Sequence, residues 1–276
     1  MKVGIKIGPA TDATVKDAAV RAEELGFDSV WLSERVAVPL DKPHPYEPGV
    51  DPWISLAFVA AVTHRVQLGT SVSQIALRPP VLMARELATL DRLSGGRLIV
   101  GAGAGWVEEE FTSTGVPFET RGGRLNEFIP LLRHLWTKPG KPWNGKHFQV
   151  PSVGLVQPLT PGGPPIFVGA GGPAGVRRAA RHGDGFISVG LPPETVAKIR
   201  RQIEEIRSGL GLSGQYPVYT QVSAPGGASD AAALVQRYAE AGVDGLIVSE
   251  GATVSGISFL DHVDVARSLL ETAHGL

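Results

Sequence analysis

The sequence contains one glycine-rich turn whose spacing suits the binding of an anion. Residues 168–173 read VGAGGP and follow a short apolar run that is typical of a buried strand. Pro173 favours the first turn of a helix. Backbone N–H groups in such a turn, at the positive end of a helix, form a cradle for an anion such as phosphate. Arg177 and Arg178 lie one turn further on and add positive charge. The alternative interpretation is a tight strand-to-helix turn without a ligand.

A second segment with chemical potential is RLIVGAGAGWVEEEF at Arg97–Phe111. Its apolar run predicts a covered parallel strand, and three glycines at alternate positions then leave room for another backbone or a flat ligand. Trp106 and three glutamates follow, which suit the N-terminus of a helix. The glycine spacing differs from that of a dinucleotide-binding turn. We interpret the segment as the edge of a binding pocket.

Glu34 and Arg35 form a third candidate, because they come directly after a short apolar strand. The alternative is a solvated pair at the start of a loop.

The sequence does not support a metal site or a nucleophilic catalytic site. The seven histidines show no metal-binding spacing, cysteine is absent, and no nucleophile motif is present. We therefore expect no metal centre.

The elements that must position these residues alternate regularly between strand and helix. The expected strands are Val3–Gly8, Ser29–Ser33, Val66–Val72, Arg97–Gly101, Pro165–Gly169, Gly185–Val189, Pro217–Ser223 and Gly245–Ser249. A helical pattern follows each of them, over Val15–Leu25, Trp53–Thr63, Pro80–Leu93, Gly122–Trp136, from Pro173 onward, Pro193–Ser208, Asp230–Ala241 and Ser258–Ala273. Eight such units predict an α/β fold, a (β/α)₈ barrel that occupies residues 1–276 as one domain.

An internal sequence repeat supports the prediction of a barrel. EELGFDSVWLSE at Glu23–Glu34 is similar to AEAGVDGLIVSE at Ala239–Glu250, and RHGDGFISV at 181–189 is a shorter copy. Each copy places an aspartate before a strand, and we interpret Asp28, Asp184 and Asp244 as structural.

Two segments depart from the alternation. The loop from Glu34 to Pro52 is a candidate lid. Residues 137–165, rich in proline and glycine, are interpreted as an inserted excursion after the fourth unit, with a hairpin turn at Asn144-Gly145. In a barrel, function belongs at the C-terminal ends of the strands. All three candidate segments fall there.

Composition excludes other classes of protein. Hydrophobic content of 43%, charge of 19% and a net charge of −1 are ordinary for an enzyme and give no reason to expect nucleic acid or membrane as partner. The first residues, MKVGIKIG, are too short and polar for a signal segment. We expect a cytoplasmic protein that acts on a small molecule.

The sequence resembles the luciferase-like monooxygenase superfamily, and within it the oxidoreductases that use coenzyme F420. The matching segments are DSVWLSE, LGTSV, RPP, DRLSGGRLIVGAGAGW, EF, RGGRLNE, LLRHLWT and PPIFVGAGGP, in the order of the family. The resemblance implies a barrel, often a homodimer, that binds F420 or FMN at its mouth. It also implies a non-prolyl cis peptide bond at Ser71-Val72 behind the ring of the cofactor.

The resemblance further implies roles for individual residues. The cofactor-binding candidates are Thr70, Ser71, Val72, Gly103, Gly105, Ala170, Gly171, Gly172 and Arg177. The catalytic candidates are Arg35, Glu34, Trp106 and Glu109.

The sequence also departs from the sugar-phosphate dehydrogenases of that family. They carry an Asp-His pair where Glu34-Arg35 stands here, and a glutamate where Trp106 stands. The hypothesis is therefore an F420-dependent oxidoreductase that transfers a hydride to or from a small, apolar organic substrate. The alternatives are an FMN-dependent monooxygenase and a non-catalytic deazaflavin-binding protein. An aldolase-type barrel is disfavoured because no lysine ends a predicted strand.

Overall fold

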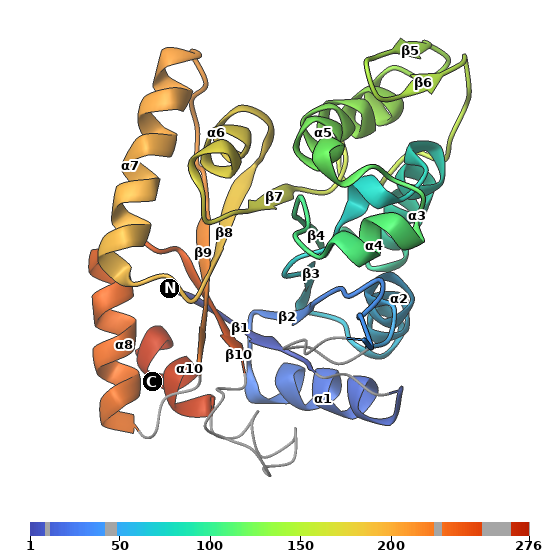
Figure 1. Ribbon diagram of the computed structural model, residues 1–276. Coiled ribbons are helices and arrows are strands. Elements are labelled where there is room, and N and C mark those ends of the chain that lie inside the picture. The colour runs from blue at the N-terminus through green and yellow to red at the C-terminus, as the bar shows by residue number, and fades with distance from the viewer. Residues whose placement is uncertain (9–11, 42–48, 224–227, 250–265, 276) are drawn as a thin grey trace.

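Eight parallel strands close into a barrel in the computed structural model, which describes residues 1–8, 12–41, 49–223, 228–249 and 266–275 (Figure 1). Their order is β1, β2, β3, β4, β7, β8, β9, β10, and β10 pairs with β1. The strands are β1 (Lys2–Lys6), β2 (Ser29–Leu32), β3 (Gln67–Thr70), β4 (Leu98–Ala102), β7 (Ile166–Gly169), β8 (Gly185–Val189), β9 (Val218–Ser223) and β10 (Gly245–Ser249).

The described helices surround the barrel. They are α1 (Asp12–Leu25), α2 (Pro52–Val62), α3 (Pro80–Leu93), α4 (Glu108–Ser113), α5 (Arg121–Thr137), α6 (Pro173–His182), α7 (Pro193–Gly209), α8 (Ala228–Glu240) and α10 (Arg267–His274), with 3₁₀ turns η1 (Ile75–Leu77) and η2 (Phe118–Thr120). Their apolar faces pack on the strands. None of the described helices is long and apolar enough to cross a membrane.

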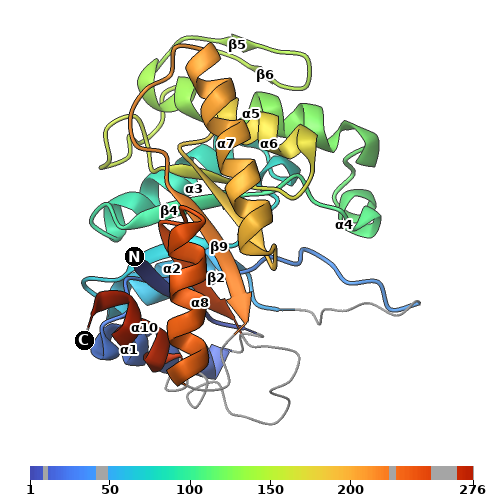
Figure 2. The ribbon, with the colours of Figure 1, turned by 90° about the vertical axis from the view of Figure 1, so that its left-hand side faces the viewer.

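The predicted barrel is confirmed, with each predicted strand in place and with shifted ends. The predicted closing helix at 258–273 lies partly outside the described residues, where α10 covers its end. The candidate lid likewise includes residues that are not described. The Asn144-Gly145 turn joins β5 (Trp143–Asn144) to β6 (Gln149–Val150), and this antiparallel hairpin lies beyond α5 (Figures 1 and 2).

The barrel interior is filled by large side chains that face glycines on neighbouring strands. The inner cluster is Trp31, Ile99, Phe167, Ile187, Tyr219 and Ile247. Trp31 is fully buried, and a Cβ atom added to Gly69 would overlap its ring. Tyr219 occupies the equivalent space at Gly245, where an added Cβ would lie 2.7 Å from the ring. The barrel therefore closes because large inward side chains on some strands lie opposite glycines on their neighbours.

Three aspartates repeat one bonding pattern at the N-terminal ends of the strands. The carboxylate of Asp28 accepts a hydrogen bond from Val3 N at 2.7 Å, and Asp28 N donates to Val3 O at 2.8 Å. Asp184 and Asp244 make the same two bonds to Ile166 and Val218. The structural interpretation of these aspartates is confirmed, because each one fixes the register of its strand against the preceding strand.

The packing of Trp31 against Gly69 predicts a large cost for one added methyl group. We expect Gly69→Ala to lower the free energy of unfolding by about 1–3 kcal/mol, because the ring is enclosed and cannot move away. Urea denaturation measures the change. Gly209→Ala is the matched control: nothing lies within 4 Å of its added Cβ, and it sits in α7. That substitution is expected to be neutral or stabilising, and an equal loss in both variants would contradict the packing argument.

Candidate functional site at the barrel mouth

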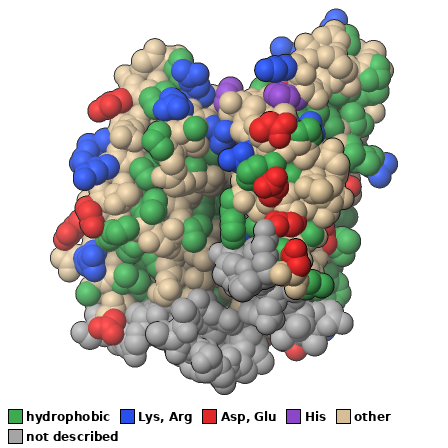
Figure 3. Space-filling view, in the orientation of Figure 1, with side chains coloured by type: hydrophobic (Ala, Val, Ile, Leu, Met, Phe, Trp, Pro, Cys, Tyr) green, Lys and Arg blue, Asp and Glu red, His purple; other side chains and the backbone are tan. Residues whose placement is uncertain are grey.

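The three candidate segments meet at one end of the barrel. Glu34-Arg35 follow β2, Thr70–Val72 end β3, the glycine segment ends β4, and the VGAGGP turn ends β7. These strands are consecutive neighbours in the barrel, so the segments lie side by side. Figure 3 shows a hollow on this face, between the side that holds α6 and α7 and the side that holds α5.

Thr70 locks β3 to β4 where the two strands end. Its hydroxyl accepts a hydrogen bond from Gly101 N at 3.0 Å and donates one to Gly101 O at 2.8 Å. A Cβ atom on Gly101 would overlap the carbonyl of Thr70. The glycine therefore admits another backbone, one of the two roles that the sequence suggested for it.

Val72 fills the space that two other glycines leave. The Ser71-Val72 peptide bond is cis, as the resemblance implied. A Cβ atom on Gly103, or on Gly169, would lie 2.6 Å from a methyl carbon of Val72. The third glycine of the segment, Gly105, faces the ring of Phe111 at 2.8 Å. The spaces beside these glycines are thus occupied by the side chains of this chain.

Inward-facing polar groups surround this level of the barrel. Ser33 Oγ donates to Ser71 O at 2.8 Å, and Ser71 Oγ lies 3.4 Å from Gln221 Oε1. Lys6 is the last residue of β1 and pairs in register with Trp31, so it lies on the inward side. The expectation that no lysine ends a strand is therefore wrong, because β1 ends two residues earlier than predicted.

Glu34 is buried in a charge cluster behind the mouth. It is 2% exposed, and its Oε2 accepts from Ser73 Oγ at 2.5 Å and from Gln74 N at 2.8 Å. Arg78 Nη1 lies 2.6 Å from Glu34 Oε1, and its Nη2 lies 2.8 Å from Asp51 Oδ2. Burial lowers the pKa of Arg78, but the two carboxylates outweigh it and the pKa is raised. Glu34 is thereby tied to the N-terminus of α2, which Asp51 caps.

Arg35 is held between a carboxylate and an aromatic ring. Its Nη1 lies 3.0 Å from Glu110 Oε2, and its Cζ lies 5.3 Å from the centre of the Trp106 ring. Trp106 is 54% exposed, and the Arg35 side chain is 17% exposed. The guanidinium therefore lies at the surface of the mouth in a fixed position. A cation so placed can bind an oxygen that carries negative charge.

Glu110 is a buried carboxylate at the candidate site that the sequence analysis did not single out. It is fully buried and accepts from Val36 N at 2.8 Å and from Gln74 Nε2 at 3.1 Å, besides Arg35. Burial raises the pKa of Glu110, and Arg35 and Val36 N oppose this only in part. The candidate Glu109 is half-buried instead. Helical spacing was the available signal, because Glu110 lies three residues after the buried Val107.

The VGAGGP turn opens the N-terminus of α6 to solvent. Gly171 and Gly172 are exposed, and nothing lies within 4 Å of a Cβ atom added to either. Gly172 is the N-cap and supplies no side chain, so the first amides of α6 have no side-chain cap. Gly175 lets the helix approach the turn, since a Cβ there would overlap that of Ala170. Arg177 is exposed, whereas Arg178 is buried.

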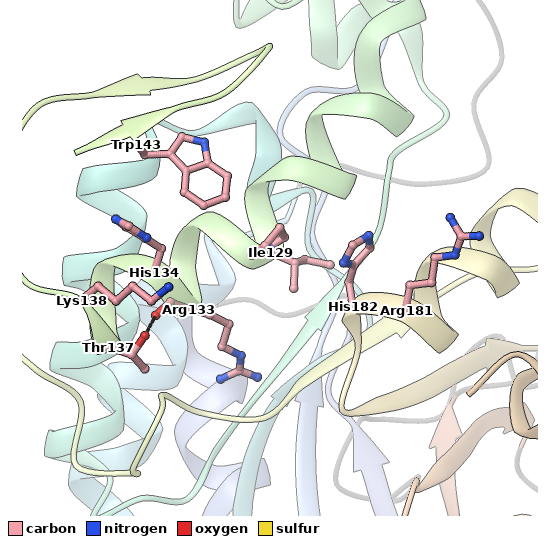
Figure 4. A pocket seen from close by; sticks show the side chains of 9 residues that line it. Ile129, Arg133, His134, Thr137, Lys138, Trp143, Arg181 and His182 are labelled. Carbon is pink, nitrogen blue, oxygen red and sulfur yellow. Dashed lines mark hydrogen bonds between the residues drawn. The ribbon is translucent and has the colours of Figure 1, made fainter. Parts of the chain in front are cut away.

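Another hollow, of about 380 Å³, lies away from the mouth between α5, α6 and the hairpin (Figure 4). Its lining residues include Arg133, His134, Lys138, Arg181 and His182. These basic residues stand near the C-terminal ends of α5 and α6, where the helix dipole favours positive charge. The same dipoles disfavour an anion there. We therefore place the candidate site at the mouth.

A closed barrel of eight parallel strands with its polar residues gathered at the strand ends has the architecture of a (β/α)₈ enzyme. The chain belongs to the luciferase-like monooxygenase family, whose sequence model matches residues 6–246. This confirms the resemblance that the sequence motifs indicated.

Two curated relatives carry the same name. The F420-dependent glucose-6-phosphate dehydrogenase of Amycolatopsis mediterranei is 38% identical over 203 residues, which cover 68% of this chain and 57% of that protein. The enzyme of that name from Kineococcus radiotolerans is 37% identical over 230 residues, covering 78% of this chain and 64% of that protein. The chain thus spans less than two thirds of the length of either relative.

Solved structures share the fold. An F420-dependent secondary alcohol dehydrogenase superposes with a TM-score of 0.87 at 18% identity, covering 99% of this chain and 98% of that one. A monooxygenase from Streptomyces bottropensis gives 0.82 at 23% identity, covering 99% and 100%.

The burial of Glu110 predicts that its charge supports the mouth. We expect Glu110→Gln to lower the free energy of unfolding by about 1–3 kcal/mol, because an amide presents a donor to groups that are themselves donors. Urea denaturation measures this. Glu108→Gln, on the exposed side of the same helix turn, is the control and should change stability by less than about 0.5 kcal/mol. Equal effects in the two variants would remove Glu110 from this role.

Proposed function

We propose that the protein is an oxidoreductase that binds coenzyme F420 and transfers a hydride between the deazaflavin and a small, apolar organic substrate. The observation that carries the proposal is the open N-terminus of α6 at the mouth of a luciferase-like barrel. The names of the two curated relatives support F420 as the cofactor.

The residues present fit a cofactor with a flat ring and a phosphate. The space beside Gly171 and Gly172 is the cradle that a side chain would fill, and the amides of the first turn of α6 suit a phosphate oxygen. Ala170 packs against Gly175 and sets the distance between turn and helix. We propose that Thr70, Ser71 and Val72, with the backbone of Gly103 and Gly105, support the ring. Arg177 adds positive charge near the phosphate.

The cofactor supplies hydride chemistry, so the tasks of the protein are orientation and charge. We place Arg35 against the substrate atom that gains negative charge, with Glu110 holding the guanidinium in position. Trp106 forms an apolar wall for the substrate beside Arg35. Glu109, half-buried at the start of α4, is the candidate for moving a proton. Glu34 positions the loop through Arg78 and Ser73.

The substrate is proposed to differ from the sugar phosphate named in the relatives. Trp106 and Arg35 stand where the family's sugar-phosphate dehydrogenases carry a glutamate and a histidine. An indole ring adds apolar surface and removes a carboxylate, so an apolar substrate with an oxygen atom facing Arg35 fits better.

Cofactor titration tests the proposal. We expect F420 to bind with a dissociation constant of about 1 μM or less, which corresponds to a binding free energy near −8 kcal/mol. The quenching of tryptophan fluorescence measures this binding. FMN should bind at least about tenfold more weakly, a difference of about 1.4 kcal/mol. Tighter binding of FMN, with oxygen-dependent turnover, would favour the monooxygenase alternative. Binding of F420 without hydride transfer to any substrate tested would favour a binding protein.

Two variants locate the binding site within that titration. Gly171→Val places a branched side chain in the open cradle and should weaken F420 binding at least about tenfold. Gly154→Val is the control, because Gly154 is likewise exposed with nothing within 4 Å of its added Cβ, and it lies in the segment between β6 and β7 instead of in the turn before α6. Unchanged affinity in Gly171→Val would place the phosphate elsewhere.

We also propose that the protein is a homodimer through the outer faces of α2 and α3, which pack side by side. Ile54, Phe58 and Leu82 on these helices are 75%, 49% and 47% exposed. Large apolar side chains grouped in this way typically contact a partner. Sedimentation should give twice the chain mass for the wild type and the chain mass for Ile54→Asp with Phe58→Asp. A monomeric wild type would contradict this proposal.

A further inference from the structure

The side chain of Gln221 crosses the interior of the barrel at the floor of the mouth. Gln221 lies two residues after Tyr219 on β9, so its side chain points to the same inward face. Its register partner on β10, Ile247, belongs to the inner apolar cluster. β9 and β3 are separated by three strands on either side, so they face each other across the closed barrel. Gln221 Oε1 nevertheless accepts a hydrogen bond from Ser71 Oγ, directly after β3, at 3.4 Å.

This contact orients the amide of Gln221. Ser71 is 4% exposed, its N donates to Leu32 O, and its O accepts from Ser33 Oγ, both at 2.8 Å. Because its hydroxyl donates to Oε1, Nε2 is the free end of the amide, and it has no hydrogen-bond acceptor among the residues that the structure describes. Gln221 is half-buried above the buried inner cluster, so its exposed part faces the mouth. The amide therefore presents N–H donors to the hollow.

A purely structural role does not account for an amide at this position. The hydrogen bond to Ser71 is long and contributes little stability. The register partners of Gln221 on both sides, Val189 and Ile247, are apolar. An apolar side chain would pack against them and would avoid the cost of covering a polar group. Lys6, at the end of β1, also faces inward and carries only donors. The floor of the mouth thus suits a ligand that offers an acceptor.

We propose that Gln221 donates a hydrogen bond from Nε2 to a carbonyl-type oxygen of the ligand in the mouth, and so selects ligands with an acceptor at their inner end. Two ligands of the proposed function carry such an oxygen, namely the ring of the cofactor and a carbonyl-bearing substrate. The inference rests on the proposed function only in placing the ligand at the mouth. Arg35 lies at the surface of the mouth, so Gln221 adds a second and deeper point of contact.

The first test exchanges the donor for other groups at the same position. Gln221→Met keeps the length of the side chain but has no N–H, and we expect it to weaken the ligand that supplies the oxygen about tenfold. Gln221→Glu replaces the NH₂ group by a carboxylate oxygen. It should weaken that ligand further, because two acceptors then face each other. Equal or tighter binding to Gln221→Glu would overturn the proposal, since the ligand would then present a donor.

Gln67→Met is the matched control. Gln67 is also a half-buried glutamine on a barrel strand, but it begins β3 at the opposite end and contacts Lys2 Nζ at 3.1 Å. Its substitution should change ligand affinity less than twofold. Urea denaturation separates binding from packing. Gln221→Met should keep or raise the free energy of unfolding, because its neighbours are apolar, while it loses affinity. A parallel loss of stability and affinity would assign Gln221 a structural role alone.

Two pairs of ligands identify the source of the oxygen. F420 and FMN both carry carbonyl oxygens on their rings, so both should lose about tenfold in Gln221→Met if the ring is the partner. Cyclohexanone and methylenecyclohexane differ by one oxygen. If the substrate is the partner, the ketone should raise the thermal unfolding midpoint of the wild type more than the hydrocarbon does. That difference should vanish in Gln221→Met, with cofactor affinity unchanged. The absence of both patterns would overturn the proposal.

These outcomes also separate the inference from the proposed function. If FMN binds and F420 does not, and FMN binding weakens in Gln221→Met, the cofactor assignment fails and the role of Gln221 stands. If F420 binds equally to the wild type and to both Gln221 variants, and the ketone and the hydrocarbon behave alike, the role of Gln221 fails and the cofactor assignment stands. The ketone and the hydrocarbon are measured with and without cofactor, so this pair decides even where no cofactor binds.

Discussion

The burial of two carboxylates behind the mouth is the constraint on which the site depends. Glu34 and Glu110 are 2% and 0% exposed, and the burial of a carboxylate is costly unless hydrogen-bond donors surround it. Arg78 and Arg35 supply the charge, and Gln74 contacts both carboxylates. The pairing fixes the chain after β2 against η1 and α4. Arg35 therefore occupies one position, which a side chain on a solvated loop would not.

Glycine has two different roles at this end of the barrel. At Gly101, Gly103 and Gly169 the missing side chain makes room for atoms of β3 and of Val72, so these positions pack the barrel. At Gly171 and Gly172 the missing side chain leaves open space in front of a helix. Sequence alone does not separate these roles, because both motifs end a strand with closely spaced glycines. The separation comes from what each strand faces, which only the folded chain defines.

The fold could be predicted from the sequence because hydrophobic periodicity and the residues that end strands and helices are local properties. The lengths of the strands, the glycines that end the helices and the repeated aspartates together indicate the barrel. The sequence placed the site at the mouth for the same reason. The sequence did not predict which of two like neighbours is buried. Glu109 and Glu110 are of one type, as are Arg177 and Arg178, and the orientation of the helix in the folded chain decides which of each pair is covered. The sequence also did not predict the end of β1, which lies at Lys6, two residues before the predicted end.

The aspartate bonds of β1, β7 and β9 lie at the opposite end of the strands from the mouth. Strand register is thus secured by residues that no ligand at the mouth can touch. Substitutions in the loops at the mouth leave these bonds intact. The chain should therefore tolerate the loss of about 1 kcal/mol in the free energy of unfolding that changes in a binding pocket commonly cause. A barrel built in this way is free to diverge in substrate while the register of its strands stays unchanged.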